Sequence, residues 1–222
     1  MSIVTNLENL HLEIPQTVQL VCVSKFHPDE ALMEAYQTGE RIFGESRVQE
    51  MTGKYERLPK DIEWHFIGHL QKNKIKNIAP FVHLIHGVDS FELLSEINKQ
   101  ALKTDRVISC LLQIHIAKED TKFGFSEDEI IEMLEEGIWK SFHNIKICGL
   151  MGMATFTDDK EQVSREFKTL HQLFSKIKNK YFSAESTFKE ISMGMSDDFH
   201  QAIDAGSTMV RVGGLIFGSR VV

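Results

Sequence analysis

The clearest strand pattern in the chain is at residues 17–25, with the sequence ThrValGlnLeuValCysValSerLys. Its β-branched and apolar residues lie between Pro15 and Pro28, and such a run predicts a strand buried on both faces. Lys25 ends the run, and lysine is among the residues least often fully buried. We therefore expect Lys25 to emerge at the carboxyl end of a parallel strand, where α/β barrels carry their chemistry. The alternative is an ordinary solvated lysine.

Outward from this stretch, short apolar runs alternate with amphipathic segments. We expect strands at residues 18–24, 41–44, 64–68, 82–88, 107–116, 145–153, 188–194 and 209–218. We expect helices between them at residues 29–36, 46–57, 71–79, 91–103, 126–137, 159–181 and 197–205. This alternation indicates parallel βαβ units, and eight strands are the number that closes a (β/α)8 barrel, the TIM barrel.

The predicted fold is therefore α/β, a single barrel domain over residues 1–222 with a leading helix at 1–14 and eight βα units at 17–218. The competing fold is an open doubly wound sheet, which would carry a glycine-rich dinucleotide turn after the first strand. That turn here reads SerLysPheHisPro, without glycine. No linker, repeat or low-complexity tract indicates a second domain.

Composition limits the expected partners. The chain has 25 Lys and Arg against 32 Asp and Glu, which argues against nonspecific binding of nucleic acid. No apolar run reaches the length of a membrane-spanning helix, and the N-terminal residues lack the pattern of a secretory signal, so we expect a cytoplasmic protein without a membrane partner. Cys22, Cys110 and Cys148 fall in predicted strands without a Cys-x-x-Cys pair, which predicts buried free thiols.

Polar residues and glycines gather near the ends of the last two predicted strands. The seventh strand contains Ser192, and the eighth contains Arg211, Gly213 and Gly214. Barrels often bind phosphate with the loops that follow these two strands. Glycine lets backbone amides approach an anion closely, and a serine hydroxyl can donate a hydrogen bond to it. We therefore predict an anion site here; a bulge or a tight barrel bend is the alternative interpretation of the paired glycines.

A desolvated amine on the first strand, together with an anion site, suggests a phosphorylated aldehyde as the ligand. Two ligands fit this description, a sugar-phosphate aldehyde and pyridoxal 5′-phosphate (PLP). Arg211 favours PLP, because the pyridine nitrogen of PLP needs a partner, either an acid or an arginine. Arginine stays charged and keeps that nitrogen unprotonated, so the ring would be a poor electron sink.

Several motifs resemble those of the PLP homeostasis protein family (YggS/PROSC type). They are PheGlyGluSerArgValGlnGlu at residues 43–50, TrpHisPheIleGlyHisLeuGlnLysAsnLys at 64–74, SerMetGlyMetSerAspAsp at 192–198, and ArgValGly followed by IlePheGlySerArg at 211–220. The likeness covers residues 15–220, and the family resembles the barrel domain of alanine racemase without its second domain. The resemblance implies a Schiff base between PLP and Lys25. It also implies phosphate contacts from Ser192 and from the backbone of Gly213 and Gly214, with Arg211 near the pyridine nitrogen.

Three positions depart from the family pattern. Ser46 stands where the family commonly has asparagine after PheGlyGlu, and it remains a candidate contact to the cofactor. Gly214 stands where serine or threonine often follows the ArgValGly glycine, so one hydroxyl to the phosphate is lost while the backbone amide remains. His115 replaces an asparagine on the fifth predicted strand.

Ten histidines raise the question of a metal site. His65 and His69 are four residues apart, but Gly68 lies between them in a strand-to-loop stretch, and His83 and His86 flank the fourth predicted strand. No ligand set with the spacing of a metal site appears. We therefore expect no metal.

Catalytic turnover is not expected. The resemblance implies that an alanine racemase needs a second base opposite its lysine, typically a tyrosine brought by another domain. Tyr36, Tyr55 and Tyr181 all fall in predicted helices, so no two-base pair is evident. We expect a monomeric PLP-binding protein of PLP (vitamin B6) homeostasis and amino-acid balance, without turnover.

Three alternatives remain open. The first is a weak PLP-dependent amino-acid racemase with Lys25 as the base. The second is a Schiff-base aldolase on sugar phosphates, with Lys118 or Lys122 as rival amines. The third is an interaction protein that hands PLP to apo PLP-dependent enzymes, with the acidic helix near residues 127–136 as a docking face; such a helix is more often plain solvated surface.

Overall fold

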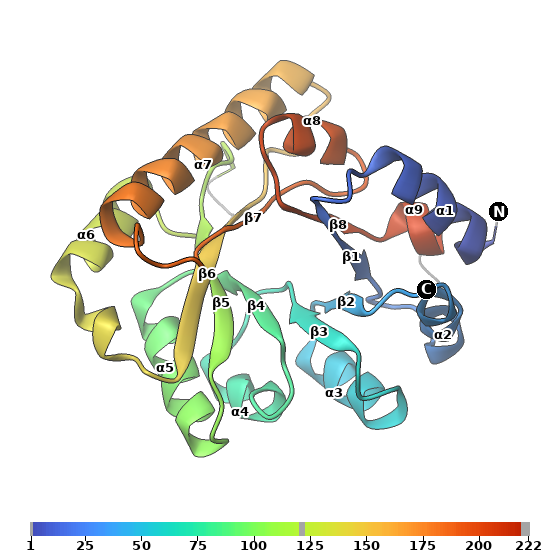
Figure 1. The fold of residues 1–222 in the computed structure, drawn as a ribbon, viewed down its shortest axis with the longest axis horizontal. Helices are drawn as coiled ribbons and strands as arrows, with labels where there is room; N and C mark the ends of the chain where they lie inside the picture. The colour runs from blue at the N-terminus through green and yellow to red at the C-terminus, as the bar shows by residue number, and fades with distance from the viewer. Residues whose placement is uncertain (1, 120–122, 219–222) are drawn as a thin grey trace.

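The computed structural model describes residues 2–119 and 123–218 and shows eight parallel strands closed into a barrel (Figure 1). The strands are β1 (Gln19–Val23), β2 (Ile42–Glu45), β3 (Glu63–Phe66), β4 (Leu84–Val88), β5 (Ile108–Ile114), β6 (Ile145–Gly152), β7 (Glu190–Ser192) and β8 (Met209–Val212). Each strand pairs with the next in sequence, and β8 pairs with β1. The prediction of an α/β barrel is confirmed, and the open doubly wound sheet is excluded.

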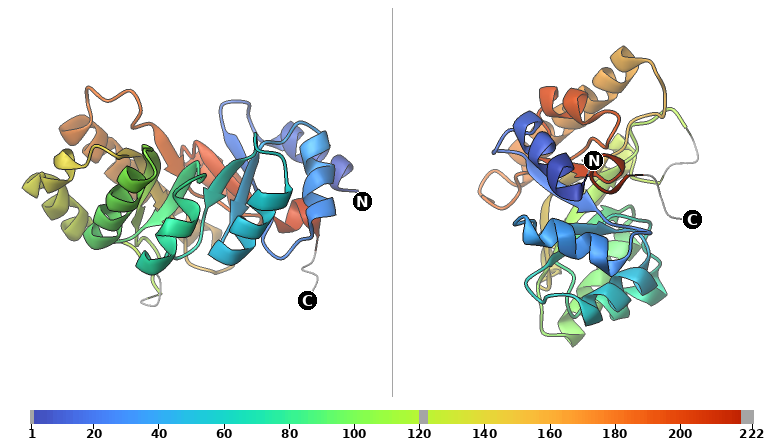
Figure 2. Two further views of the ribbon diagram at one scale, coloured as in Figure 1. Left: turned by 90° about the horizontal axis from the view of Figure 1, so that it is seen from below. Right: turned by 90° about the vertical axis from the view of Figure 1, so that its right-hand side faces the viewer.

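Helices surround the barrel (Figures 1 and 2). They are α1 (Ile3–Glu13), α2 (Asp29–Gln37), α3 (Val48–Arg57), α4 (Ile75–Ile78), α5 (Phe91–Lys103), α6 (Glu127–Glu136), α7 (Lys160–Tyr181), α8 (Phe199–Asp204) and α9 (Gly214–Phe217), with 3-10 turns η1 (Lys72–Lys74) and η2 (Ile138–Ser141). The leading helix α1 packs against α2 and α9. Within the described ranges, no helix has both the length and the apolar composition of a membrane span.

Two layers of side chains form the core. The larger layer lies between strands and helices, where α7 contributes a stripe that includes Phe167, Leu170 and Ile177. The smaller apolar cluster consists of Val21, Leu84, Leu111, Met151 and Met209. These residues share the inward face of the barrel with buried polar residues, because neighbours in register point to the same side of a sheet. The polar set is His65, His86, Gln113, Ser192 and Arg211.

Two predicted elements differ from the structure. The strand expected at 209–218 ends at Val212, and the following residues form the short helix α9, which buries Ile216. Periodicity cannot distinguish a short buried helix from a strand in an apolar run. The helix expected at 71–79 is reduced to η1 and α4, where only Ile75 and Ile78 are buried, so little apolar contact is available to extend it.

The three cysteines are free thiols, as expected. Cys22 and Cys110 are buried, and burial raises the pKa of both thiols. Cys148 is only half-buried, since it lies at the amino-terminal mouth of the barrel and lines a cavity there. The expectation of burial is therefore wrong for Cys148.

Candidate functional site

Lys25 and Arg211 come from neighbouring strands. Lys25 is half-buried and follows the last residue of β1 by two positions. In the pairing of β1 with β8, Val21 lies opposite Arg211. Gly213 packs directly on β1, because a Cβ at this glycine would lie 2.9 Å from the carbonyl oxygen of Val23. The structure thus brings three of the predicted site residues, Lys25, Arg211 and Gly213, to the carboxyl end of one strand pair.

A buried polar network adjoins Lys25 on its N-terminal side. The Ser24 hydroxyl donates to Glu45 Oε1 at 2.6 Å, and Lys54 Nζ donates to the same oxygen at 2.7 Å. Lys54 Nζ also donates to the carbonyl oxygen of Ser24 at 2.8 Å. All three residues are buried. The ion pair therefore ties the end of β1 to β2 and α3 through charge-assisted hydrogen bonds.

The residue after Lys25 is held in a similar way. The Phe26 N–H donates to Glu50 Oε1 at 2.6 Å, and that oxygen also accepts from Lys54 Nζ at 2.8 Å. Phe26 has a φ of 68°, a left-handed conformation that is rare for an aromatic residue and is often found at functional sites. The Arg47 guanidinium lies 4.5 Å from the centre of the Phe26 ring. Both neighbours of Lys25 are thus anchored, which restricts the direction of its side chain.

Glu45 is electrostatically dependent on Lys54. Burial raises the pKa of the Glu45 carboxyl, while Lys54 and the Ser24 hydroxyl act in the opposite direction. Glu45 Oε2 is buried and has no hydrogen-bond partner within residues 2–119 and 123–218. A buried carboxylate with one charged partner is stable as an ion only while that partner remains.

Arg211 is buried inside the barrel, with 4% of its surface exposed. Its Nη1 donates to Ser192 Oγ at 2.6 Å, and its Nη2 donates to the Gly152 carbonyl oxygen at 3.3 Å. Burial lowers the pKa of Arg211 to about 10, with Asp198 opposing the shift, so the guanidinium remains charged near neutral pH. His86 Nδ1 lies 2.9 Å from the same Ser192 oxygen. The Ser192 hydroxyl therefore helps to fix the position of the Arg211 guanidinium.

Gly213 is the N-cap residue of helix α9 and Gly214 is its first residue, so the two do not form a β-bulge. The Gly213 N–H donates to Ser196 Oγ at 3.4 Å. A Cβ added at Gly214 would meet that same oxygen at 3.8 Å, an ordinary contact. The first amides of a helix have no intrahelical acceptors. Ser196, in the loop after β7, is thus the serine beside the paired glycines, whereas the sequence pattern predicts Ser192.

Two further predicted positions lie at other strand ends. Ser46 is half-buried after β2, and its carbonyl oxygen would lie 2.5 Å from a Cβ at Gly68, so the two loops are in close contact. His115 follows β5, and its Nε2 lies 2.9 Å from the carbonyl oxygen of Glu119. His115 is thus engaged with the loop after β5.

The rival amine Lys118 differs from Lys25 in burial. Lys118 is exposed, and its Nζ donates to Gln162 Oε1 at 3.2 Å. Such a solvated amine lacks the desolvation that activates a lysine for imine formation. Lys122 lies outside the described residues.

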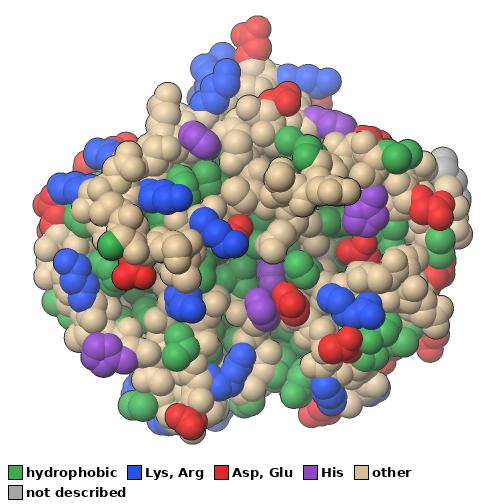
Figure 3. All heavy atoms as spheres, in the orientation of Figure 1, with side chains coloured by type: hydrophobic (Ala, Val, Ile, Leu, Met, Phe, Trp, Pro, Cys, Tyr) green, Lys and Arg blue, Asp and Glu red, His purple; other side chains and the backbone are tan. Residues whose placement is uncertain are grey.

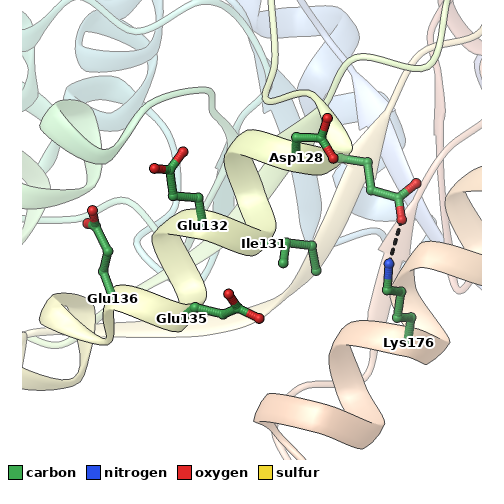
Figure 4. A pocket seen from close by; sticks show the side chains of 7 residues that line it. Asp128, Ile131, Glu132, Glu135, Glu136 and Lys176 are labelled. Carbon is green, nitrogen blue, oxygen red and sulfur yellow. Dashed lines mark hydrogen bonds and ion pairs between the residues drawn. The ribbon is translucent and has the colours of Figure 1, made fainter.

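Helix α6 lies outside the barrel (Figure 1), and its acidic face is exposed. Together with α7 it borders an open cavity of about 470 Å³ (Figure 4). The residues that line it are Glu127, Asp128, Ile131, Glu132, Glu135, Glu136 and Lys176. Lys176 Nζ pairs with Glu127 Oε1 at 2.7 Å, and the carboxylates of this face are exposed, as on a solvated helix.

Comparison with known proteins agrees with the fold. The model of the alanine racemase N-terminal domain family matches residues 2–221. A pyridoxal phosphate homeostasis protein of Aquifex aeolicus is 39% identical over 203 residues, which are 91% of this chain and 87% of that protein. One of Vibrio alginolyticus is 37% identical over 214 residues, 93% of this chain and 88% of that protein.

Solved structures extend the comparison. PipY of Synechococcus elongatus, with PLP bound, has a TM-score of 0.89 at 32% identity and covers 98% of this chain and 100% of its own. An alanine racemase of Clostridium difficile has a TM-score of 0.76 at 16% identity, with 98% of this chain and 60% of that one covered, which shows the shared fold alone. The molecule is thus a barrel of the alanine racemase type. The chain belongs to the alanine racemase N-terminal domain family, among the pyridoxal phosphate homeostasis proteins.

Proposed function

We propose that this chain binds PLP as a Schiff base on Lys25 and serves in intracellular PLP (vitamin B6) homeostasis and amino-acid balance. The observation that carries the proposal is the meeting of Lys25, Arg211 and Gly213 on the β1–β8 pair. The PLP-bound PipY structure, which covers 98% of this chain, supports it.

The side chains of the site fit PLP. A half-buried amine can form the imine, and a buried guanidinium with a fixed direction suits the pyridine nitrogen. The backbone amides and the Ser196 hydroxyl at the start of α9 suit a phosphate. In this proposal Lys25 holds the aldehyde carbon and Arg211 faces the ring nitrogen, with Ser192 fixing the guanidinium. The phosphate is held by Gly213, Gly214 and Ser196. Ser46 remains a candidate contact to the ring.

We further propose that the protein does not turn over a substrate. The bound cofactor supplies an electrophilic imine, but a racemase also needs a second base opposite the lysine. Tyr36 and Tyr181 lie on α2 and α7, and their hydroxyls donate to Asp61 and Glu135 on the outside of the barrel. Tyr55 lies on α3, where its ring stacks on Phe81. The pyridoxal phosphate homeostasis proteins among the relatives support the same conclusion.

The proposal extends to partners and setting. A cofactor held covalently but reversibly can be released to apo PLP-dependent enzymes, and these are the partners we propose. We also propose a monomer in the cytoplasm. The free thiols Cys22, Cys110 and Cys148 agree with a reducing compartment. The measurement that addresses the oligomeric state is light scattering on the purified protein.

The direct test is an absorbance spectrum of the purified protein with PLP. We expect a Schiff-base band that Lys25→Ala abolishes and that Lys118→Ala, a matched loss of an exposed amine, leaves unchanged. Borohydride followed by peptide mass spectrometry should place the reduced adduct on Lys25. A Lys25→Ala protein that keeps the band would refute the assignment of the imine lysine.

The same preparation separates the alternatives. Turnover of L-alanine well above that of free PLP would support a weak racemase with Lys25 as the base. Trapping of a sugar phosphate in place of PLP, recognised by the mass of the adduct, would support an aldolase.

A further inference from the structure

The barrel interior contains a column of histidines that extends away from the cofactor site. His86 Nδ1 lies 2.9 Å from Ser192 Oγ, and His86 Nε2 lies 3.0 Å from His65 Nδ1. The His65 ring stacks on the His83 ring, with their centres 5.5 Å apart. His83 Nε2 in turn lies 3.5 Å from Glu63 Oε2. The column thus runs from Ser192, which contacts Arg211, to the amino-terminal mouth of the barrel, opposite the cofactor site.

Three of these residues converge at that mouth. Glu63, His65 and His83 each offer one ligand atom, and these atoms all lie within 4.8 Å of one another. Sequence spacing pairs His65 with His69 and His83 with His86. The structure instead groups His65 with His83, because β3 and β4 are neighbours in the sheet. Spacing along the chain, on which the expectation of no metal rests, does not reveal this group.

The free nitrogen of His65 is the second observation. His65 is buried, with 2% of its surface exposed, and its Nε2 has no hydrogen-bond partner in the described part of the chain. Its Nδ1 is already engaged with His86, so Nε2 is the atom available for a ligand. An unpaired polar atom in such a position is unfavourable unless something binds it.

We propose that Glu63, His65 and His83 form a binding site for a divalent transition-metal ion of the Zn²⁺ class. Two imidazole nitrogens and one carboxylate oxygen are a ligand set that Zn²⁺ uses, with water completing the coordination. The hydrogen bond between His65 Nδ1 and His86 Nε2 is the outer contact that orients a ligating imidazole. Lys54, Glu45 and the other groups near Lys25 take no part.

The surroundings give an ion room and access. A cavity of about 290 Å³ opens at this mouth, and the three residues line it together with Lys146, Cys148 and Lys189, among others. Lys189 Nζ is near Glu190 Oε1 at 3.6 Å, which offsets one of the two cations. Figure 3 views the barrel from this side and shows histidine, acidic and basic side chains around a hollow near the centre. The Glu63 carboxylate disfavours an anion at the point where the three ligand atoms meet.

The test is a calorimetric titration of tag-free protein with ZnCl₂, with and without PLP. We expect one ion per chain, and binding weakened about tenfold or more by Glu63→Gln and by His83→Asn, each of which removes a ligand from the exposed side. His69→Asn is the matched control, because His69 pairs with Asp89 at 3.0 Å after β3 and lies outside the group.

Other results would overturn the proposal. One is that the parent protein does not bind Zn²⁺ at millimolar concentration. Another is that Glu63→Gln and His83→Asn bind Zn²⁺ as tightly as the parent protein does. A third is that the control His69→Asn loses as much affinity as those two variants do. If inorganic phosphate stabilises the protein, Zn²⁺ does not, and His83→Asn abolishes the effect of phosphate, then the site at this mouth binds an anion. Circular dichroism of each variant confirms that the barrel is folded, so that a loss of binding reports on the ligands.

Discussion

Among single residues, Lys54 has the largest consequence for the cofactor site. It is 3% exposed, and its Nζ contacts Glu45, Glu50 and the Ser24 carbonyl oxygen. These bonds fix the residues on both sides of Lys25. Removing one member of a buried ion pair leaves an uncompensated charge, which typically destabilises a protein by about 3–5 kcal/mol.

We therefore expect Lys54→Met to lower the free energy of unfolding by about 3 kcal/mol at pH 8, and by less at pH 5. The pKa of Glu45 is already raised in the folded state, so the folded protein binds more protons than the unfolded chain above the usual carboxyl range. Stability from this group is present at low pH and falls as pH rises towards the folded pKa. Because Lys54 lowers the pKa of Glu45, its loss raises that pKa further. The loss of stability between pH 5 and pH 8 therefore becomes larger in the variant.

Urea unfolding of both proteins at the two pH values checks this prediction. Lys103→Met, an exposed lysine in the last turn of α5, is the control and should change stability little. An equal loss at pH 5 and pH 8 would show that Glu45 is not the group left unpaired.

At the scale of elements, the end of β8 shapes the proposed phosphate site. The strand stops at Val212, and the chain turns at Gly213 into α9. The sequence predicts that the paired glycines approach an anion. That prediction does not depend on whether they lie in a strand or at the start of a helix. The sequence does not predict which serine lies beside these glycines, because Ser192 and Ser196 belong to the same motif. The turn after β7 places Ser196 beside Gly213, while Ser192 contacts Arg211.

The pairs Glu45–Lys54 and His65–His83 escape sequence reasoning for a related physical reason. Each joins residues of different elements, and their contact follows from packing of α3 on the barrel or from the neighbouring strands β3 and β4. The sequence alone shows only that a charged residue, Glu45, ends an apolar strand, and this does not identify its partner. Strand ends and glycines can be read along the chain, whereas side-chain partners require the closed barrel.

The start of α9 also yields a prediction about Gly214. A Cβ there meets no atom closer than 3.8 Å, so a side chain can be added without a clash. We expect Gly214→Ser to tighten PLP binding about tenfold, since a hydrogen bond to a charged group contributes about 1.5 kcal/mol. Fluorescence titration of the protein with PLP measures the change.

Gly214→Ala is the matched control, because it adds the Cβ without a hydroxyl. Its affinity should stay near that of the parent protein. If serine and alanine have the same effect, the phosphate does not lie against this end of α9.

At the scale of the whole molecule, the barrel is closed by its first and last strands. β8 pairs with β1 over Gln19–Cys22, but with β7 only at Ser192 and Met209. The proposed cofactor contacts span this closure, since Lys25 follows β1 while Arg211 and the glycines belong to β8 and α9. The alternation of elements predicts eight strands because that pattern is local, and the closure itself depends on contacts between the two ends of the chain.

A ligand that bridges this closure binds the folded barrel and not the unfolded chain. At a PLP concentration about 100 times the Kd, the expected stabilisation is about 2.7 kcal/mol, which for a chain of this size raises the Tm by roughly 5–10 °C. Thermal unfolding should show this rise with PLP, and a much smaller one with pyridoxal, which keeps the aldehyde but lacks the phosphate. Lys25→Ala should lose most of the rise while retaining the same Tm without ligand, because its side chain is half-buried at a strand end. Equal shifts with PLP and pyridoxal would place the ligand away from Gly213 and Gly214.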